Sequence, residues 1–273
     1  GLITSNQYKR DQVSELTMVL ESKEDLKVVG LTGTPLEIIR SLGYGLVSVE
    51  KRNQEHVEII ERTTNLKPYN ILLQHQSEVT GKAIYRLNIT DDLKTFKSQM
   101  VSEGYFNEDE ILVLHADPKV KSGEDFKSLL KDGAFRDSIK VVLTTSIIDE
   151  GISLEQKGFT DVVFIDGISY NPRPEAVKQF FARFRDHDPN RNNFYYRKVR
   201  EMVHGYNSIT EEYINIMQKL DHYRDINSNL KGVFNSDEYL YNNKEINLYF
   251  VAFKASQIYF EKLSPFEFKR FLE

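Results

Sequence analysis

The sequence predicts an α/β fold in which a parallel sheet is covered by helices on both faces, followed by a helical C-terminal extension. Three observations support this fold class. Between residues 81 and 183, short apolar runs alternate with segments of helical periodicity, as in parallel sheets with crossover helices. Turn-forming residues separate these segments. Beyond about residue 191 the strand patterns cease and helical patterns follow.

The individual elements are predicted from local patterns. Runs rich in branched and aromatic residues predict strands at 27–32, 46–49, 57–62, 82–87, 110–115, 140–144 and 161–166. Helical spacing of apolar residues predicts helices at 7–20, 91–103, 124–131, 174–183, 209–224 and 246–263. A last helix is expected to begin at Ser264, where Pro265 suits the first turn and Glu267 completes a capping box.

These elements divide the chain into three parts. Residues 1–42 hold one helix and one strand, so we interpret them as the end of a domain whose earlier part is missing. Residues 43–192 carry the alternating strands and helices, and residues 193–273 form the helical extension. With 273 residues, of which 40% are hydrophobic, the chain can bury a substantial core.

Composition excludes several classes of protein. A chain without cysteine has no disulfides and no thiolate metal sites, and its six scattered histidines do not indicate a metal site. No stretch is apolar for long enough to span a membrane, and the first residues lack the apolar core of a signal peptide. We therefore expect a cytoplasmic protein with no membrane partner and no metal site of its own.

The charge is unevenly distributed. A formal net charge of -5 argues against a protein that coats nucleic acid by bulk electrostatics. Residues 171–200 nevertheless carry eight basic and three acidic residues, with Phe194, Tyr195 and Tyr196 among them. Such a strip could hold a phosphate backbone and stack a base, or it could be an exposed charged helix and loop.

Several catalytic signatures are absent from the sequence. There is no phosphate-binding loop of the form G-x-x-x-x-G-K-[ST] and no strand ending in a DExx box, so this chain alone is not expected to hydrolyse ATP. There is also no G-x-S-x-G elbow. The adjacent carboxylates Asp149 and Glu150 usually point apart in such a position, which argues against a glycosidase.

Three short motifs occur in an informative order. They are VVGLTGTP at 28–35, TTSIIDEGIS at 144–153 and QFFARFRD at 179–186. Together they resemble motifs III, V and VI of superfamily 2 helicases of the DEAD/DEAH type, over about residues 28–186. The resemblance implies that residues 43–192 are a second, C-terminal RecA-like lobe and that residues 1–42 are a remnant of the first lobe, including motif III.

The resemblance also implies roles for residues of motifs III and V. In motif III, Thr32, Gly33 and Thr34 would couple the ATP site to nucleic acid. In motif V, Thr144 and Thr145 would contact nucleic acid, and the Thr145 hydroxyl suits a phosphate oxygen. The nucleotide-facing residues of motif V would be Glu150, Gly151 and Ser153, the last standing where aspartate is common.

In motif VI the resemblance implies a catalytic role for Gln179, Arg183 and Arg185. A guanidinium that reaches the γ-phosphate would stabilise charge that develops during phosphoryl transfer. The match is imperfect, because Ala182 replaces a glycine and Asp186 stands where the family has its second arginine. Arg185 lies one residue early and is the expected finger, while Arg183 is in register.

Polar residues that follow predicted strands complete the expected site. Asn88 and Thr90 follow one strand and His115 follows the next, where open α/β sheets bind ligands and where the family contacts nucleic acid. The resemblance implies DNA or RNA as partner, held as a single strand by its backbone, and the missing N-terminal RecA-like lobe as a second partner. ATP and magnesium would be cofactors of the intact protein, with none held by this chain alone.

The expected function is therefore the C-terminal lobe of an ATP-dependent helicase or translocase. The alternative is a non-catalytic nucleic-acid-binding or regulatory module on the same scaffold, favoured by the altered motif VI and the acidic balance. An enzyme of Rossmann type would need a glycine-rich loop after its first strand, and the sequence has none.

Overall fold

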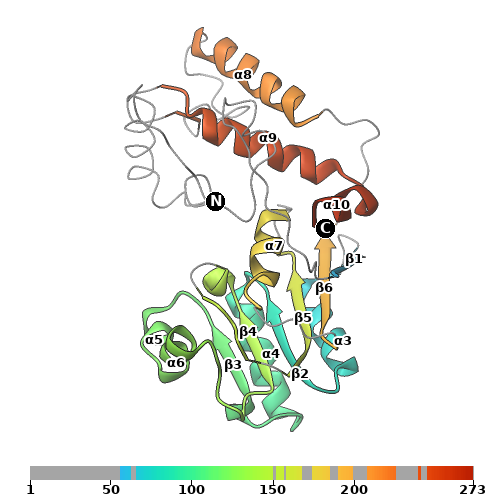
Figure 1. The fold of residues 1–273 in the computed structure, drawn as a ribbon, viewed down its shortest axis with the longest axis vertical. Coiled ribbons are helices and arrows are strands. Elements are labelled where there is room, and N and C mark those ends of the chain that lie inside the picture. The colour runs from blue at the N-terminus through green and yellow to red at the C-terminus, as the bar shows by residue number, and fades with distance from the viewer. Residues whose placement is uncertain are drawn as a thin grey trace. The chain divides into compact units, whose positions relative to one another are not determined.

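The computed structural model describes residues 56–62, 66–149, 152–156, 158–167, 174–184, 190–198, 208–225, 239–240 and 245–272 (Figure 1). These residues belong to two compact units: one contains those up to 198 together with 263–272, and the other those from 208 to 262. The elements expected at 7–20, 27–32 and 46–49 lie outside the described residues.

The first unit is built on a six-stranded sheet with the order β1-β6-β5-β2-β4-β3. Its strands are β1 Glu58–Arg62, β2 Lys82–Arg86, β3 Ile111–Leu114, β4 Val141–Thr144, β5 Phe159–Ile165 and β6 Asn192–Lys198. Every neighbouring pair in it runs parallel. β4 is buried along its whole length, as expected for a parallel strand that is covered on both faces. The predicted α/β class with a parallel sheet is confirmed.

Two helices pack on one face of the sheet. They are α3 Pro68–Glu78 and α4 Thr90–Ser102. Their buried side chains join Tyr85, Leu143 and Val163 of three adjacent strands in one apolar core. Tyr85 is fully buried, and its hydroxyl donates to Gln76 Oε1 of α3 at 3.0 Å. Burial therefore fixes the position of α3 with the help of a satisfied polar contact.

Two other helices pack on the opposite face, α7 Pro174–Phe181 and α10 Pro265–Leu272. Phe164 of β5 meets Phe180 of α7 with 5.7 Å between ring centroids, and Tyr195 of β6 meets Phe268 of α10 at 5.7 Å. Phe164 follows Val163 directly in β5, and adjacent strand residues point to opposite faces. Both faces of the sheet are therefore covered, as predicted.

The connection from β3 to β4 contains two short helices, α5 Pro118–Lys121 and α6 Glu124–Asp132. The capping box predicted for the last helix is present: Ser264 N–H donates to Glu267 Oε2 at 3.0 Å, and Glu267 N–H donates to Ser264 Oγ at 3.4 Å. The helix begins one residue later, at Pro265. The sequence signal for its start is thus confirmed.

Besides the single-turn elements, one helix and one strand of the first unit were not expected from the sequence. The first is α3, whose inward face includes the polar residues His75 and Gln76. The second is β6, and the prediction that strands cease beyond residue 191 is wrong, because Asn192–Lys198 pairs with both β1 and β5. The boundary expected between residues 192 and 193 consequently lies within a strand of the sheet.

The basic and aromatic strip is also explained by β6. Tyr195 and Arg197 are buried, at 0% and 1% exposure, so they cannot offer a surface to nucleic acid. The Arg197 guanidinium donates to the Leu263 carbonyl at 2.7 Å and stacks over Phe268, 4.5 Å from the ring centroid. For these two residues both interpretations made from the sequence are wrong, because an inward-facing arginine was not considered.

The second unit is described through two packed helices, α8 Ile209–Asp225 and α9 Leu248–Lys262. They confirm the helices predicted at 209–224 and 246–263. A half-buried ion pair joins them, with Lys262 Nζ 2.6 Å from Glu212 Oε1. None of the helices in the described part of the chain combines the length and apolarity needed to cross a membrane.

His75 is enclosed by aromatic rings in the core of the first unit. It is 7% exposed, its ring lies 4.9 Å from that of Phe194, and its Nδ1 is hydrogen-bonded to the Tyr196 hydroxyl at 2.7 Å. Burial lowers the pKa of His75, since desolvation disfavours the charged imidazolium, although Asp161 and Glu78 partly oppose this effect.

We expect the free energy of unfolding to decrease as pH falls through the ordinary histidine pKa of about 6.5. Below that pH this histidine binds a proton in the unfolded chain, whereas folded His75 stays neutral. The stabilisation that neutral His75 gives the folded state is therefore present above the ordinary pKa and is lost as the pH falls below it. Urea unfolding between about pH 8 and pH 5.5 measures the slope. His75→Phe should weaken the dependence of the unfolding free energy on pH. An equal dependence in the variant and the unaltered chain would contradict the lowered pKa of His75.

Candidate functional site

The predicted nucleic-acid residues follow adjacent strands at the carboxyl edge of the sheet. In the ladder, Arg86 of β2 pairs with Thr144 of β4, and Thr144 pairs with Leu114 of β3. Since neighbouring strands lie about 4.8 Å apart, the residues that follow these three positions emerge side by side. Asn88 and His115 are two of them. Both therefore lie at the carboxyl ends of parallel strands, as the sequence indicated.

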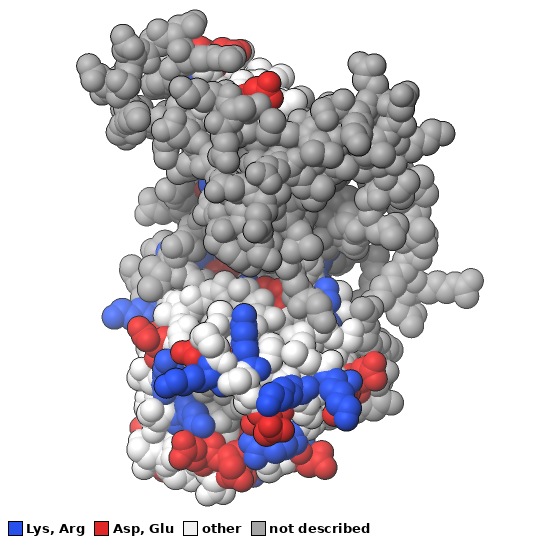
Figure 2. Space-filling model, turned by 90° about the vertical axis from the view of Figure 1, so that its left-hand side faces the viewer, with Lys and Arg blue, Asp and Glu red and all other residues white. Residues whose placement is uncertain are grey.

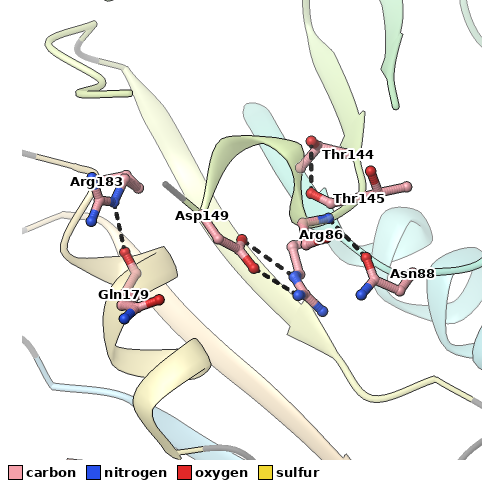
Figure 3. Close-up of polar contacts among 8 residues, drawn as sticks. Arg86, Asn88, Thr144, Thr145, Asp149, Gln179 and Arg183 are labelled. Atoms are coloured by element: carbon pink, nitrogen blue, oxygen red, sulfur yellow. Dashed lines mark hydrogen bonds and ion pairs between the residues drawn. The ribbon is translucent and has the colours of Figure 1, made fainter. Parts of the chain in front are cut away.

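The hydrogen bonds of the sheet continue past the strand ends. Leu87 N–H donates to the Thr144 carbonyl at 2.8 Å, and Thr145 N–H donates to the Leu114 carbonyl at 3.1 Å. Asn88 Oδ1 accepts a bond from Ser146 N–H at 2.8 Å (Figure 3). The turn after β4 is therefore fastened to both neighbouring strand ends.

Thr144 and Thr145 differ in what they present. Thr144 is fully buried, and its hydroxyl donates to the Thr145 carbonyl at 3.1 Å (Figure 3). Thr145 is half-buried, and its hydroxyl has no hydrogen-bond partner among the described residues. Thr144 thus supports the turn, while Thr145 offers a hydroxyl to a ligand.

Other polar groups at this edge also keep hydrogen-bonding capacity. Within the part of the chain that the structure describes, Asn88 Nδ2, the Thr90 hydroxyl and His115 Nε2 have no protein partner. Asn88 is exposed, and the other two are half-buried. Together with Thr145 they form the strand-end group, a set of uncharged or weakly basic donors suited to phosphate oxygens.

A buried ion pair lies beneath this edge. Arg86, the last residue of β2, meets Asp149 in a two-pronged contact, with Nη2 2.7 Å from Oδ2 and Nε 3.4 Å from Oδ1 (Figure 3). Both side chains are 8% exposed, and the guanidinium stacks over Phe164 at 4.2 Å from the ring centroid. Sequence reasoning missed this pair; the available signal was an arginine inside the apolar run KAIYRLN.

A second group of predicted residues lies at the end of α7. Arg183 Nε donates to the Gln179 carbonyl at 3.0 Å, and Arg183 Nη1 donates to the Ile152 carbonyl at 3.2 Å. Leu154 N–H in turn donates to the Arg183 carbonyl at 2.7 Å. Figure 3 shows Arg183 beside Gln179, as a group separate from Arg86 and Asp149. Motifs V and VI are therefore joined through Arg183.

The remaining predicted residues are placed as follows. Ser153 is half-buried within the segment that Arg183 holds. Among the described residues there is no group of three histidine, aspartate or glutamate side chains that could bind a metal ion. The predicted residues that lie outside the described part of the chain are Thr32, Gly33, Thr34, Glu150, Gly151 and Arg185.

Charges on the described surface are mixed. On the face drawn in Figure 2, the described lysine and arginine side chains alternate with aspartate and glutamate. Ion pairs elsewhere among the described residues join Arg136 to Asp125, with Nε 2.5 Å from Oδ1, and Lys140 to Glu110 at 2.6 Å. The described part of that face thus offers no broad basic surface, and any grip on a polyanion there depends on individual donors.

Comparisons with known proteins yield similarities of fold alone. No protein family and no curated protein sequence matches the chain. Among solved structures, the C-terminal domain of the DEAD-box protein Dbp5 is 18% identical with a TM-score of 0.38, and the match covers 62% of this chain and 86% of that domain.

Two further structures are similar. The Pyrococcus furiosus Hef helicase domain is 22% identical with a TM-score of 0.29, over 47% of this chain and 25% of that one. The C-terminal part of the Fun30 ATPase domain is 13% identical with a TM-score of 0.34, over 68% of this chain and 52% of that one. At these TM-scores and identities the similarities do not assign a function.

The buried ion pair gives a stability prediction. We expect Arg86→Ala to lower the free energy of unfolding by about 3 to 5 kcal/mol, because it leaves the Asp149 carboxylate buried without its guanidinium. Arg136→Ala breaks a two-pronged pair of the same kind at the surface, where Arg136 is 53% exposed, and should cost about 1 kcal/mol or less. Denaturant unfolding measures the loss of unfolding free energy in both variants. Equal losses would contradict the larger effect expected for the buried pair.

Proposed function

We propose that this chain provides the C-terminal RecA-like lobe of an ATP-dependent nucleic-acid helicase or translocase. In the proposed protein, a first lobe supplies the phosphate-binding loop and the magnesium ligands. This lobe grips one strand by its backbone and completes the ATP site from the opposite side. The proposal rests chiefly on the strand-end group, in which Asn88, Thr90, His115 and Thr145 present unpartnered polar atoms at one edge of a parallel sheet.

The chemistry of the strand-end group favours a phosphate backbone. A hydroxyl, an amide N–H and an imidazole N–H are donors of the kind that bind phosphate oxygens and carry no base information. Their position at the carboxyl ends of parallel strands is where open α/β sheets bind ligands. We therefore expect low sequence preference and a modest dependence on salt, since few charged side chains take part.

The ATP side of the proposal concerns motifs V and VI. Glu150, Gly151 and Ser153 are proposed to face the nucleotide, and Arg185 to act on its γ-phosphate, with Gln179 and Arg183 supporting the site from the end of α7. Bound ATP and magnesium would supply the phosphoryl group and the charge neutralisation. The contact of Arg183 with Ile152 supports the proposal, because it brings the two motifs together in one group.

One observation favours the alternative of a non-catalytic binding module on the same scaffold. The Arg183 guanidinium is engaged by two backbone carbonyls, those of Gln179 and Ile152, and so does not project freely as an arginine finger. In such a module Arg183 would serve only to hold the segment that contains Ser153. The strand-end group would bind a single strand without any ATP-dependent change.

Binding of single strands tests the first part of the proposal. We expect the chain to bind a fluorescent single-stranded oligonucleotide, and Thr145→Val to weaken the affinity by about tenfold, since it removes one hydrogen bond to phosphate. The matched control is Thr160→Val, which removes the hydroxyl that donates to the Lys82 carbonyl at the opposite edge of the sheet. Equal affinities in the Thr145 variant and the unaltered chain would contradict the proposed contact.

ATP hydrolysis by the protein that joins this chain to its first lobe separates the two candidates. For a motor, we expect Arg185→Ala to reduce nucleic-acid-stimulated turnover by about 10³-fold or more, as for arginine fingers. Arg183→Ala should also reduce it, through loss of the contact with motif V. Unchanged turnover in both variants, measured beside intact single-strand binding, would favour the non-catalytic module.

A further inference from the structure

We infer that Arg86 is a positioning residue that fixes the segment 145–154 for its proposed contacts with nucleic acid and nucleotide. The inference rests on the proposed function and deepens it. Arg86 touches neither ligand in this arrangement; it would act through Asp149. The consequence is that a residue at the end of β2, outside all three sequence motifs, sets the conformation of motif V.

The start of the segment 145–154 is held by residues at the end of β2. The end of β2 holds the turn after β4 at two points: Asn88 Oδ1 accepts from Ser146 N–H, and the Arg86 guanidinium binds the Asp149 carboxylate. Between these points residues Ser146–Ile148 form one short 3-10 turn. Two ties three residues apart leave this turn little freedom to rotate, and Thr145, which directly precedes it, is also held through its N–H by the Leu114 carbonyl.

The end of the segment is held in a comparable way by α7. Arg183 donates to the Ile152 carbonyl, and Leu154 N–H donates to the Arg183 carbonyl. Ser153 therefore lies between two residues that bind Arg183, Ile152 through its carbonyl and Leu154 through its N–H.

The energetics of the pair support a positioning role. A buried ion pair contributes little net stability compared with well-packed apolar side chains of similar volume, because desolvation offsets the attraction. Arg86 and Asp149 are each 8% exposed, and the stack on Phe164 further restricts the guanidinium. Unlike an apolar pair, the ion pair fixes the orientation of the two side chains relative to each other, since a planar guanidinium and a carboxylate meet in one preferred geometry.

The experiment compares the unaltered chain with three variants. Arg86→Gln breaks the pair, Arg86→Met with Asp149→Leu replaces it by apolar side chains of similar size, and Arg136→Gln breaks the matched surface pair with Asp125. For each we would measure the thermal midpoint, amide hydrogen exchange over residues 145–154, and affinity for a single-stranded oligonucleotide of mixed sequence. The apolar double variant is decisive, because it separates stability from positioning.

For the double variant we expect a thermal midpoint near that of the unaltered chain, but faster exchange over 145–154 and an affinity weakened about tenfold. Arg86→Gln should lose both midpoint and affinity, and Arg136→Gln should keep all three properties. If the double variant regains affinity together with its midpoint, Arg86 has only a structural role and the inference is overturned.

The exchange measurement keeps the inference distinct from the proposed function. An unaltered chain that binds no single strand would overturn the proposed nucleic-acid contact. The exchange rates would then still decide whether Arg86 fixes the segment. Unchanged exchange over 145–154 in both Arg86 variants would overturn the inference even if the unaltered chain binds nucleic acid tightly.

Discussion

The alignment of β2 with β4 is the constraint on which the rest of the candidate site depends. In this register Arg86 lies opposite Thr144, and Arg86 and Phe164 of β5 are also paired. Because strand side chains alternate between faces, a slip of one residue would turn Arg86 toward the α3 side and Tyr85 toward α7. The same slip would remove Asn88 from the Ser146 amide. The site is therefore specified by the packing of the sheet, since Tyr85 is fully buried and resists such a slip.

The face of the sheet that carries this site is built partly from arginine and aromatic side chains. Arg86 stacks over Phe164 at 4.2 Å, and Arg197 stacks over Phe268 at 4.5 Å. A guanidinium tolerates such surroundings better than an ammonium, because it is more weakly hydrated and stacks on rings through its plane. Each arginine is also hydrogen-bonded, to Asp149 and to the Leu263 carbonyl. Buried charge is thus used here to connect elements that lie far apart in the sequence.

This use of charge explains how much of the fold could be predicted from the sequence. β2, β3, β4 and β5 were found because apolar residues predominate in each of them, and the strand-end group followed from their positions. β6 was missed because Asn192–Lys198 reads NNFYYRK, a polar string whose inward residues include an arginine. The contact of Arg86 with Asp149 joins residues 63 positions apart, so no local pattern could reveal it. The sequence does not show which strands pair, and this pairing determines which residues a charged side chain contacts.

The engagement of Arg183 bears on how the altered motif VI would work. Its guanidinium would give up hydrogen bonds to two carbonyls in order to reach a nucleotide, and each such bond contributes about 0.5 to 1.5 kcal/mol net. A side chain that makes two such hydrogen bonds is better suited to hold motif V than to move between open and closed lobes. An arginine finger acts only when the lobes meet, so it works best if its guanidinium makes no strong hydrogen bonds before they do. The proposed division of work follows from this contrast: Arg183 anchors the segment that contains Ser153, and the finger role passes to Arg185.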